Sequence, residues 1–201
     1  MNRLLILALV AALALVACSA PESPVAPPAP DAPGTVTVVE TAATTPVVTP
    51  TTTGIPPLGS PDTTRKENWS REPAELTVTG FRIGEHDTFD RLVFDLQGTG
   101  APGWIIDYTE QPLQQASGLP VEYTGTTALQ IIITGTPYPF EDDADLLAHG
   151  PHPGGGVIND VTFASLFEAH SEFVVGLNAE LPYSVTFLED PKRLVIDLIK
   201  L

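Results

Sequence analysis

Four side chains that could act together chemically stand close to one another near residue 90. His86 and Asp87 are followed by Asp90 and Arg91, so one loop could bring together an imidazole, two carboxylates and a guanidinium. Such groups can bind a polar ligand or transfer protons. Hydrogen bonds and ion pairs that close a hairpin explain the same residue types, and we favour that structural role. His86, Asp87 and Arg91 are kept as candidate ligand-binding residues.

A second group of potential ligands lies in a stretch rich in Pro and Gly. The acidic residues of 141–145 are followed by His149 and His152. Carboxylate oxygens at this spacing could hold Ca²⁺, and imidazoles could hold a transition metal. The spacing does not match the EF-hand pattern of alternating oxygen ligands, a central Gly and a final Glu. We interpret the stretch as a solvated acidic loop and predict no metal site and no cofactor.

The usual motifs of catalysis are missing from the sequence. There is no Gly-x-Ser-x-Gly turn and no His-Glu-x-x-His pair, and Cys18 is the only cysteine. We therefore expect a protein that is not an enzyme.

The amino terminus has the form of a signal peptide. A positive charge at Arg3 precedes an uncharged, apolar run over residues 4–17. This run is shorter than the about 20 apolar residues that a membrane-spanning helix needs. The segment is therefore expected to direct export and not to remain as an anchor.

The end of that run predicts a lipid anchor instead. Leu15-Val16-Ala17-Cys18 resembles the bacterial lipobox, which implies recognition through Leu15 and Ala17, cleavage after residue 17 and acylation of Cys18, with palmitate as one expected acyl chain. More than one acyl chain on a residue gives stable anchoring. An ordinary secretory signal peptide cut near Ala20 is the alternative.

Residues 18–73 differ sharply in composition from the rest of the mature chain. Residues 19–73 contain 12 of the 21 prolines, with repeated Thr and Ala. Such a segment favours extended conformations and cannot bury enough apolar area to offset the entropy of ordering. We predict a disordered linker over 18–73, for which O-glycosylation is a further option.

Residues 74–201 have the length of one domain. Apolar and polar residues alternate there in short runs that Gly and Pro separate. This pattern predicts an all-β, mostly antiparallel β-sandwich of short strands over residues 76–83, 92–96, 104–108, 129–134, 157–163, 172–177, 183–188 and 194–199. Residues 163–169 could form one short helix or a turn between strands.

One strand sequence occurs twice in this domain. Residues 91–96 and 193–198 both begin Arg-Leu-Val and continue with an apolar residue, Asp and Leu. We interpret them as equivalent strands of two sheets, with Asp95 and Asp197 on the solvent side.

The order of several motifs resembles the AMIN-like domain of bacterial lipoproteins over residues 76–200. They are the segments 84–94, 103–108, 129–131, 138–139, 161–168 and 190–197. The resemblance implies a β-sandwich related to the AMIN domains of cell-wall amidases and secretins, which are non-catalytic modules that target the envelope or peptidoglycan. No hydrolase domain accompanies it in this sequence.

The charge of residues 74–201 limits the partners. These residues include 5 basic and 19 acidic side chains, and 5 − 19 gives a net charge of −14. Nucleic acid, anionic lipid surfaces and wall teichoic acids are therefore poor partners unless cations bridge them, because phosphate binding needs clustered Lys and Arg, and we expect no nucleic-acid partner. Neutral glycans, peptides and basic proteins remain. Trp104 is the candidate aromatic platform for a glycan, with a position in the core as its alternative.

We therefore expect an exported lipoprotein, anchored to the outer face of the cell membrane or facing the periplasm, whose domain binds peptidoglycan or an envelope protein. A structural lipoprotein that assembles with a secretion or division protein is the alternative. A third hypothesis is an envelope hydrolase that acts through His86 or Asp87.

Overall fold

The computed structural model describes residues 54–70, 73–139 and 147–201, and in this part of the chain all regular structure is β. The strands are β1 (Lys66–Asn68), β2 (Glu75–Glu85), β3 (Phe89–Thr99), β4 (Gly103–Thr109), β5 (Thr127–Thr134), β6 (Gly150–Gly155), β7 (Ile158–Phe167), β8 (His170–Leu177), β9 (Tyr183–Leu188) and β10 (Arg193–Ile199). No helix able to span a membrane occurs among these residues.

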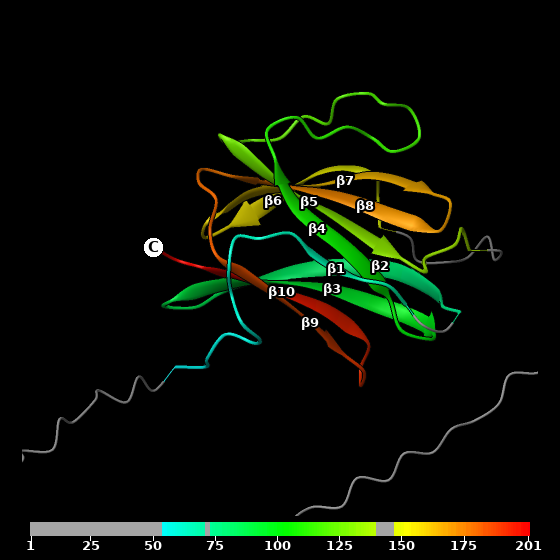
Figure 1. The fold of residues 1–201 in the computed structure, drawn as a ribbon, viewed down its shortest axis with the longest axis horizontal. Coiled ribbons are helices and arrows are strands. Elements are labelled where there is room, and N and C mark those ends of the chain that lie inside the picture. Colours follow the sequence, from blue (N-terminus) through cyan, green and yellow to red (C-terminus); the bar gives the residue numbers. More distant parts are fainter. Residues whose placement is uncertain (1–53, 71–72, 140–146) are drawn as a thin grey trace, which may run out of the picture. The chain divides into compact units, whose positions relative to one another are not determined.

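The strands form two antiparallel sheets that pack against each other (Figure 1). One sheet has six strands in the order β1-β4-β5-β8-β7-β6, and the other has four in the order β2-β3-β10-β9. The predicted fold class, an antiparallel β-sandwich, is confirmed.

Period-two alternation places one face of each sheet in the core. In β3, Leu92 and Phe94 are fully buried, and Phe94 meets Phe173 of the opposite sheet at a ring-centroid distance of 4.6 Å. Fully burying such a side chain contributes about 1.5–3 kcal/mol. The packed faces therefore fix how the two sheets sit on each other.

All eight predicted strands are present, and two further strands were missed. The segment that forms β6 has the sequence Gly-Pro-His-Pro-Gly-Gly and reads as a loop. It is tolerated because β6 lies at the end of its sheet, where a proline without an N–H removes no required hydrogen bond. The short strand β1 lies in the segment predicted as linker.

The optional helix over 163–169 does not form. Strand β7 continues to Phe167, and Glu168 and Ala169 adopt positive φ angles of 49° and 61° in the turn to β8. Only Glu168 and Ala169 form the predicted turn, whereas residues 163–167 extend β7.

The repeated strand sequence has a different meaning from the one expected. Its two copies, β3 and β10, are neighbours in the four-stranded sheet and do not belong to two sheets. In their antiparallel register Arg91 lies opposite Asp197, and Asp95 lies opposite Arg193. Two antiparallel copies of this sequence therefore place an Arg opposite an Asp at two positions of their pairing.

Residues 54–70, here named the strap, are packed against the domain, although their composition predicted a linker. The Leu58 amide donates to Asp197 Oδ2 at 2.6 Å, and the Ser184 hydroxyl donates to the Leu58 carbonyl. Asp62 and Tyr183 exchange two backbone hydrogen bonds, and β1 then pairs with β4. Composition did not reveal this order because several partners that satisfy the strap lie more than 100 residues away.

The strap connects the two sheets along one edge of the sandwich (cyan in Figure 1). It crosses the face of the four-stranded sheet that carries Asp197, passes the edge strand β9 and ends as an edge strand of the six-stranded sheet. The fully buried Tyr183 reinforces it, since its hydroxyl lies 3.0 Å from the Thr64 carbonyl oxygen and 2.9 Å from that of Ile106.

Candidate functional site

The residues first singled out near residue 90 serve mainly to close a hairpin. His86 lies in the turn between β2 and β3, where its amide donates to the Phe89 carbonyl at 3.0 Å and its ring stacks on Phe89 at 4.4 Å. Asp87 is exposed in the same turn. With Ile55 and Pro56 of the strap, His86 and Asp87 line a shallow cleft of about 380 Å³.

Asp90 and Arg91 point to opposite faces of β3 and do not join that cleft. Asp90 is fully buried and accepts a hydrogen bond from the Val157 amide at 2.7 Å. Lys200 Nζ lies 2.8 Å from Asp90 Oδ1, while the hydrogen bond of this ammonium goes to the His86 carbonyl at 2.7 Å. The Lys200–Asp90 contact is therefore electrostatic. Asp90 thus connects β3 with the turn at Val157 and with the C-terminal segment at Lys200.

Arg91 is committed to Asp197. Its Nε and Nη2 donate to the two carboxylate oxygens at 2.7 and 2.8 Å, and this pairing raises the pKa of the guanidinium. The Asp197 side chain is completely buried, and the Leu58 amide of the strap donates to its Oδ2 at 2.6 Å. The expectation that Asp197 is a solvent-side residue is wrong, whereas Asp95 forms an exposed pair with Arg82.

Trp104 lies on β4 in the other sheet and is half-buried against the hydrophobic core. The structure therefore does not bring it together with His86, Asp87 and Arg91. This packing against the core agrees with the alternative position, and the role of Trp104 as a glycan platform stays a prediction.

The remaining sequence candidates are only partly described. Leu15, Ala17, Cys18 and the acidic stretch 141–145 lie outside the described residues. His149 stacks on Phe163 at 4.1 Å, and His152 meets the Phe81 ring edge-on at 5.4 Å. No group of three His, Cys, Asp or Glu side chains able to hold a metal ion occurs among the residues described.

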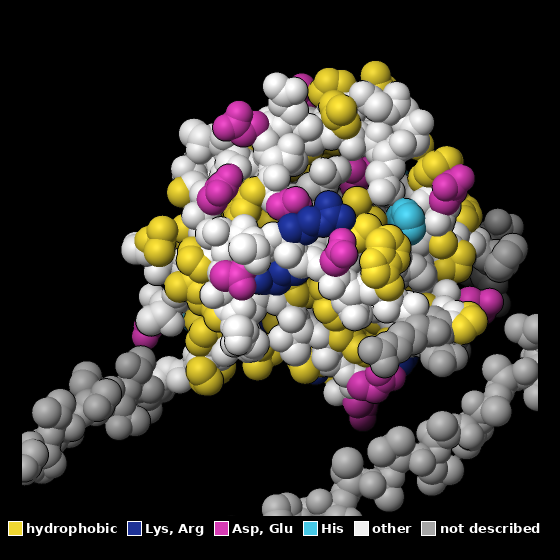
Figure 2. All heavy atoms as spheres, in the orientation of Figure 1, with side chains coloured by type: hydrophobic (Ala, Val, Ile, Leu, Met, Phe, Trp, Pro, Cys, Tyr) yellow, Lys and Arg dark blue, Asp and Glu magenta, His cyan; other side chains and the backbone are white. Residues whose placement is uncertain are grey.

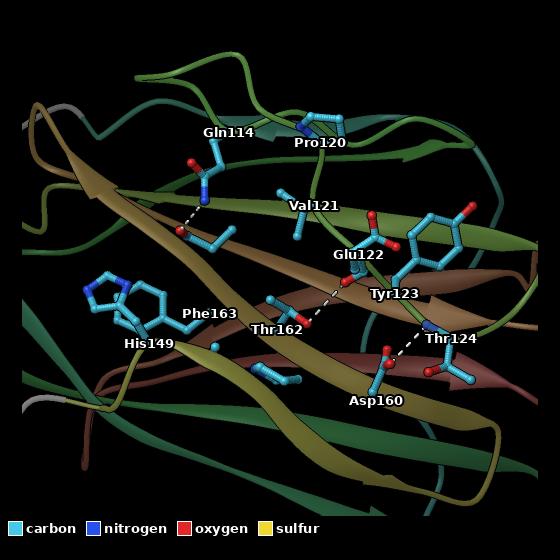
Figure 3. A pocket seen from close by; sticks show the side chains of 13 residues that line it. Gln114, Pro120, Val121, Glu122, Tyr123, Thr124, His149, Asp160, Thr162 and Phe163 are labelled. Atoms are coloured by element: carbon cyan, nitrogen blue, oxygen red, sulfur yellow. Dashed lines mark hydrogen bonds between the residues drawn. The ribbon is translucent and has the colours of Figure 1, made fainter.

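A larger concave site than the cleft at His86 lies under the loop that connects β4 to β5. This loop, residues 110–126, is named the flap, and it covers part of the outer face of the six-stranded sheet (Figure 1). Between the flap and strands β6 and β7 lies a groove of about 570 Å³. Figure 3 shows Gln114, Val121 and Tyr123 on the flap side and Thr162 on the strand side.

A buried carboxylate holds one end of the flap in place. Glu172 of β8 is fully buried and accepts hydrogen bonds from the Gln115 amide at 3.1 Å, Gln130 Nε2 at 2.6 Å and Ser165 Oγ at 2.7 Å. A buried carboxylate requires such partners, because burial without them is strongly unfavourable. The Glu172 network therefore fixes the flap backbone to three strands.

Further contacts fix the flap along its length. Val121 packs with Ala128 and Val174 in a small second core, and Gln114 Nε2 donates to the Ala164 carbonyl at 3.2 Å. The Tyr123 hydroxyl donates to the Glu110 carbonyl at 3.1 Å within the flap itself. The groove is thus bounded by a wall with defined side-chain positions.

The groove lining combines aromatic rings with hydrogen-bonding side chains and negative charge. Tyr123 lies at one end, and at the other end the exposed His149 stacks on Phe163, which is itself buried in the core (Figure 3). Glu122 and Asp160 contribute carboxylates, and the described lining residues include no Lys or Arg. Such a lining can hold polyhydroxylated or peptide ligands by stacking and hydrogen bonding.

This site was not predicted from the sequence, although one signal was present. The flap separates two predicted strands by a long stretch, and loops of more than about 12–15 residues within a compact domain are usually functional. Gln, Ser, Gly and Pro dominate its first half, so it reads as an ordinary connection. Its contacts to β7 and β8 arise only from tertiary structure.

Comparison with known protein families identifies this architecture. The model of the AMIN-like domain matches residues 76–200. The chain belongs to the AMIN-like domain family. No curated protein and no solved structure matches the chain.

The AMIN-like domain includes the whole groove but not the strap. Strands β2 to β10 and the flap fall within the matched range or differ from it by one residue, whereas β1 precedes it by eight residues or more. The strap lies outside the matched range and supplies the edge strand β1 of the six-stranded sheet. Family membership indicates a targeting or binding module.

Proposed function

We propose that this protein is a membrane-tethered, non-catalytic binding module that holds peptidoglycan in the groove beneath the flap. The observation that carries the proposal is the groove itself, a fixed concave site of about 570 Å³ within an AMIN-like domain. Its size lies in the range of ligand-binding clefts, and its rings and amides suit a glycan or a short peptide.

The membrane anchor is the acyl group proposed for Cys18, and a peptide segment connects it to the domain. Because the strap begins the described part of the domain at residue 54, this segment is shorter than the linker predicted over 18–73. From Cys18 to Gly54 there are 35 intervening residues (54 − 18 − 1), which span at most about 120 Å when fully extended. The domain would reach the cell wall from the membrane surface within that radius.

Sedimentation with purified peptidoglycan tests the binding proposal. We expect the full chain, purified in detergent, to sediment with peptidoglycan, and a Tyr123→Ala variant to bind about three- to tenfold more weakly, because it loses a stacking contact. Tyr138→Ala is the matched control, because Tyr138 is an exposed tyrosine that does not line the groove. Absence of sedimentation, or equal losses for both variants, would refute the proposed site.

The anchor is tested separately. Cells grown with labelled palmitate should incorporate the label into the wild-type chain but not into Cys18→Ser, which should leave the membrane fraction. An unlabelled wild-type chain would contradict acylation and leave the groove proposal untouched.

A further inference from the structure

The distribution of charge along the chain divides the domain into two unlike halves. From Leu92 to Pro191 there are 100 consecutive residues (191 − 92 + 1) without a single Lys or Arg, and this stretch contains 14 Asp and Glu residues. Strands β4 to β8 and the flap all lie within it. Apart from β1, the six-stranded sheet therefore has no cationic side chain other than histidine.

The cations that the structure describes lie on the strap, on the four-stranded sheet or next to it, and most are already paired. The ion pairs are Arg65–Glu67, Lys66–Asp62, Arg82–Asp95, Arg91–Asp197, Lys192–Glu189 and Lys200–Asp90. Figure 2 shows one face of the molecule, on which dark blue side chains lie in the middle and none lies at the upper end of the described part. The described residues that line the groove all belong to the stretch of chain without Lys or Arg.

The two groove carboxylates have no cation beside them. Among the described residues neither Glu122 nor Asp160 has an ion-pair partner, whereas Asp90, Asp95 and Asp197 each have one. Asp160 Oδ2 accepts the Thr124 amide at 2.9 Å, but Asp160 Oδ1 is buried and has no hydrogen-bond donor in the described structure. Oδ1 lies against Gly176, so the negative charge of Asp160 is not offset by any cation or by a second hydrogen-bond donor among the described residues.

The position of Asp160 is fixed by its surroundings. A Cβ at Gly176 of β8 would lie 2.4 Å from Asp160 Oδ1 and 2.3 Å from the Thr124 carbonyl oxygen, so only glycine leaves room for both groups. The neighbouring Asn159 side chain donates to the same Thr124 carbonyl at 2.9 Å. The carboxylate is therefore held beside Thr124, the residue that follows Glu122 and Tyr123 in the flap (Figure 3).

We propose that the groove binds its ligand through a primary ammonium group, and that this group is the free side-chain amine of a peptidoglycan stem peptide. An ammonium supplies the positive charge that Glu122 and Asp160 lack, and the face of the Tyr123 ring offers a further favourable contact for a cation. Stem peptides also have carboxylates, which the acidic half of the domain repels. Only stems whose amine is free would overcome that repulsion, so the amine decides which stems bind.

This inference rests on the proposed function, and one experiment separates the two. Sacculi with free side-chain amines and the same sacculi after N-acetylation with acetic anhydride are each sedimented with the full chain in detergent. We expect acetylation to weaken binding about three- to tenfold, as expected for loss of one partly exposed charge pair. Added NaCl should weaken binding to the untreated sacculi, because salt screens charges beyond about 10 Å at 0.1 M.

Two variants connect the effect to the groove. Glu122→Gln should weaken binding to untreated sacculi by a similar factor and have no further effect on acetylated sacculi. Glu180→Gln removes the same charge from an exposed position outside the groove and should bind like the wild type. Asp160→Asn, checked for folding by circular dichroism, should behave as Glu122→Gln does.

The outcomes are distinct. Equal binding to untreated and acetylated sacculi would overturn the ammonium inference and leave peptidoglycan binding intact. An acetylation effect that Glu122→Gln and Glu180→Gln share equally would place the charge recognition outside the groove and also overturn the inference. Absence of binding to either preparation would overturn the proposed function and this inference together.

Discussion

Asp197→Ala should destabilise the domain far more than Asp95→Ala, although each change removes one carboxylate from the same sheet. The Asp197 side chain is completely buried and that of its partner Arg91 is 19% exposed, whereas the Asp95 and Arg82 side chains are 36% and 54% exposed. Both pairs have two nitrogen–oxygen contacts of 2.7–2.8 Å, so burial and the strap are the main differences.

The expected magnitudes follow from that burial. Removing one partner of a buried pair typically costs about 3–5 kcal/mol, because the other charge is left uncompensated. We expect about 3 kcal/mol for Asp197→Ala, since Arg91 keeps some contact with water and the Leu58 amide also loses its acceptor. An exposed pair contributes only about 0–1 kcal/mol, so Asp95→Ala should have little effect.

Urea unfolding, followed by circular dichroism and tryptophan fluorescence, measures both changes. With a slope of about 2 kcal/mol/M, a loss of about 3 kcal/mol lowers the midpoint by about 1.5 M. Asp95→Ala should lower it by no more than about 0.5 M. If the two variants unfold at the same urea concentration, the strap does not bury Asp197 in solution and the reasoning is wrong.

Three further predictions concern Asp62 of the strap, Gly156 in the turn between β6 and β7, and Glu172 of β8. Hydrogen bonds from Lys66 and Thr64 lower the pKa of Asp62 from 3.8 to about 2. Their stabilising effect is therefore full above about pH 4 and is lost as the pH falls through about 2. NMR titration of Asp62 should find a midpoint near pH 2, and Lys66→Ala should raise this midpoint. Gly156→Ala should lower the free energy of unfolding in urea by at least about 1–3 kcal/mol, because Gly156 has a φ of +60° and a Cβ there would lie 1.9 Å from Asp90 Oδ2. An unchanged free energy of unfolding would contradict this packing. Glu172→Ala should speed hydrogen exchange at residues 113–118 and leave β2 and β3 unchanged, and unchanged exchange in the flap would show that Glu172 does not hold it.

The sheet architecture was predictable because alternation is a local property of the chain. Runs such as residues 92–96 and 194–199 alternate apolar and polar side chains, and a sandwich that buries one face of each sheet requires this pattern. The full width of the six-stranded sheet was harder to predict from the sequence. Its edge strands β1 and β6 contain polar residues, prolines and glycines, and they are strands only because a neighbouring strand supplies the hydrogen bonds.

The candidate site was harder to predict, since its residues become neighbours only in the folded chain. His86 and Asp87 are close in sequence and stand out for that reason, yet they lie in a hairpin turn. Tyr123 and Asp160 are 37 residues apart (160 − 123), and no spacing rule connects them. The absence of Lys and Arg from residues 92–191 was visible in the sequence, but its meaning depends on knowing that β4 to β8, which lie within this stretch, form most of the six-stranded sheet.

Backbone NMR of the isotope-labelled chain, titrated with soluble peptidoglycan fragments that have free amines, tests the central claim most directly. Binding in the groove predicts amide shift changes concentrated at residues 114, 121–124, 149–150 and 160–164, with the strap and β10 unaffected. Shift changes confined to the cleft of His86 and Asp87, or no changes at saturating fragment concentrations, would contradict it.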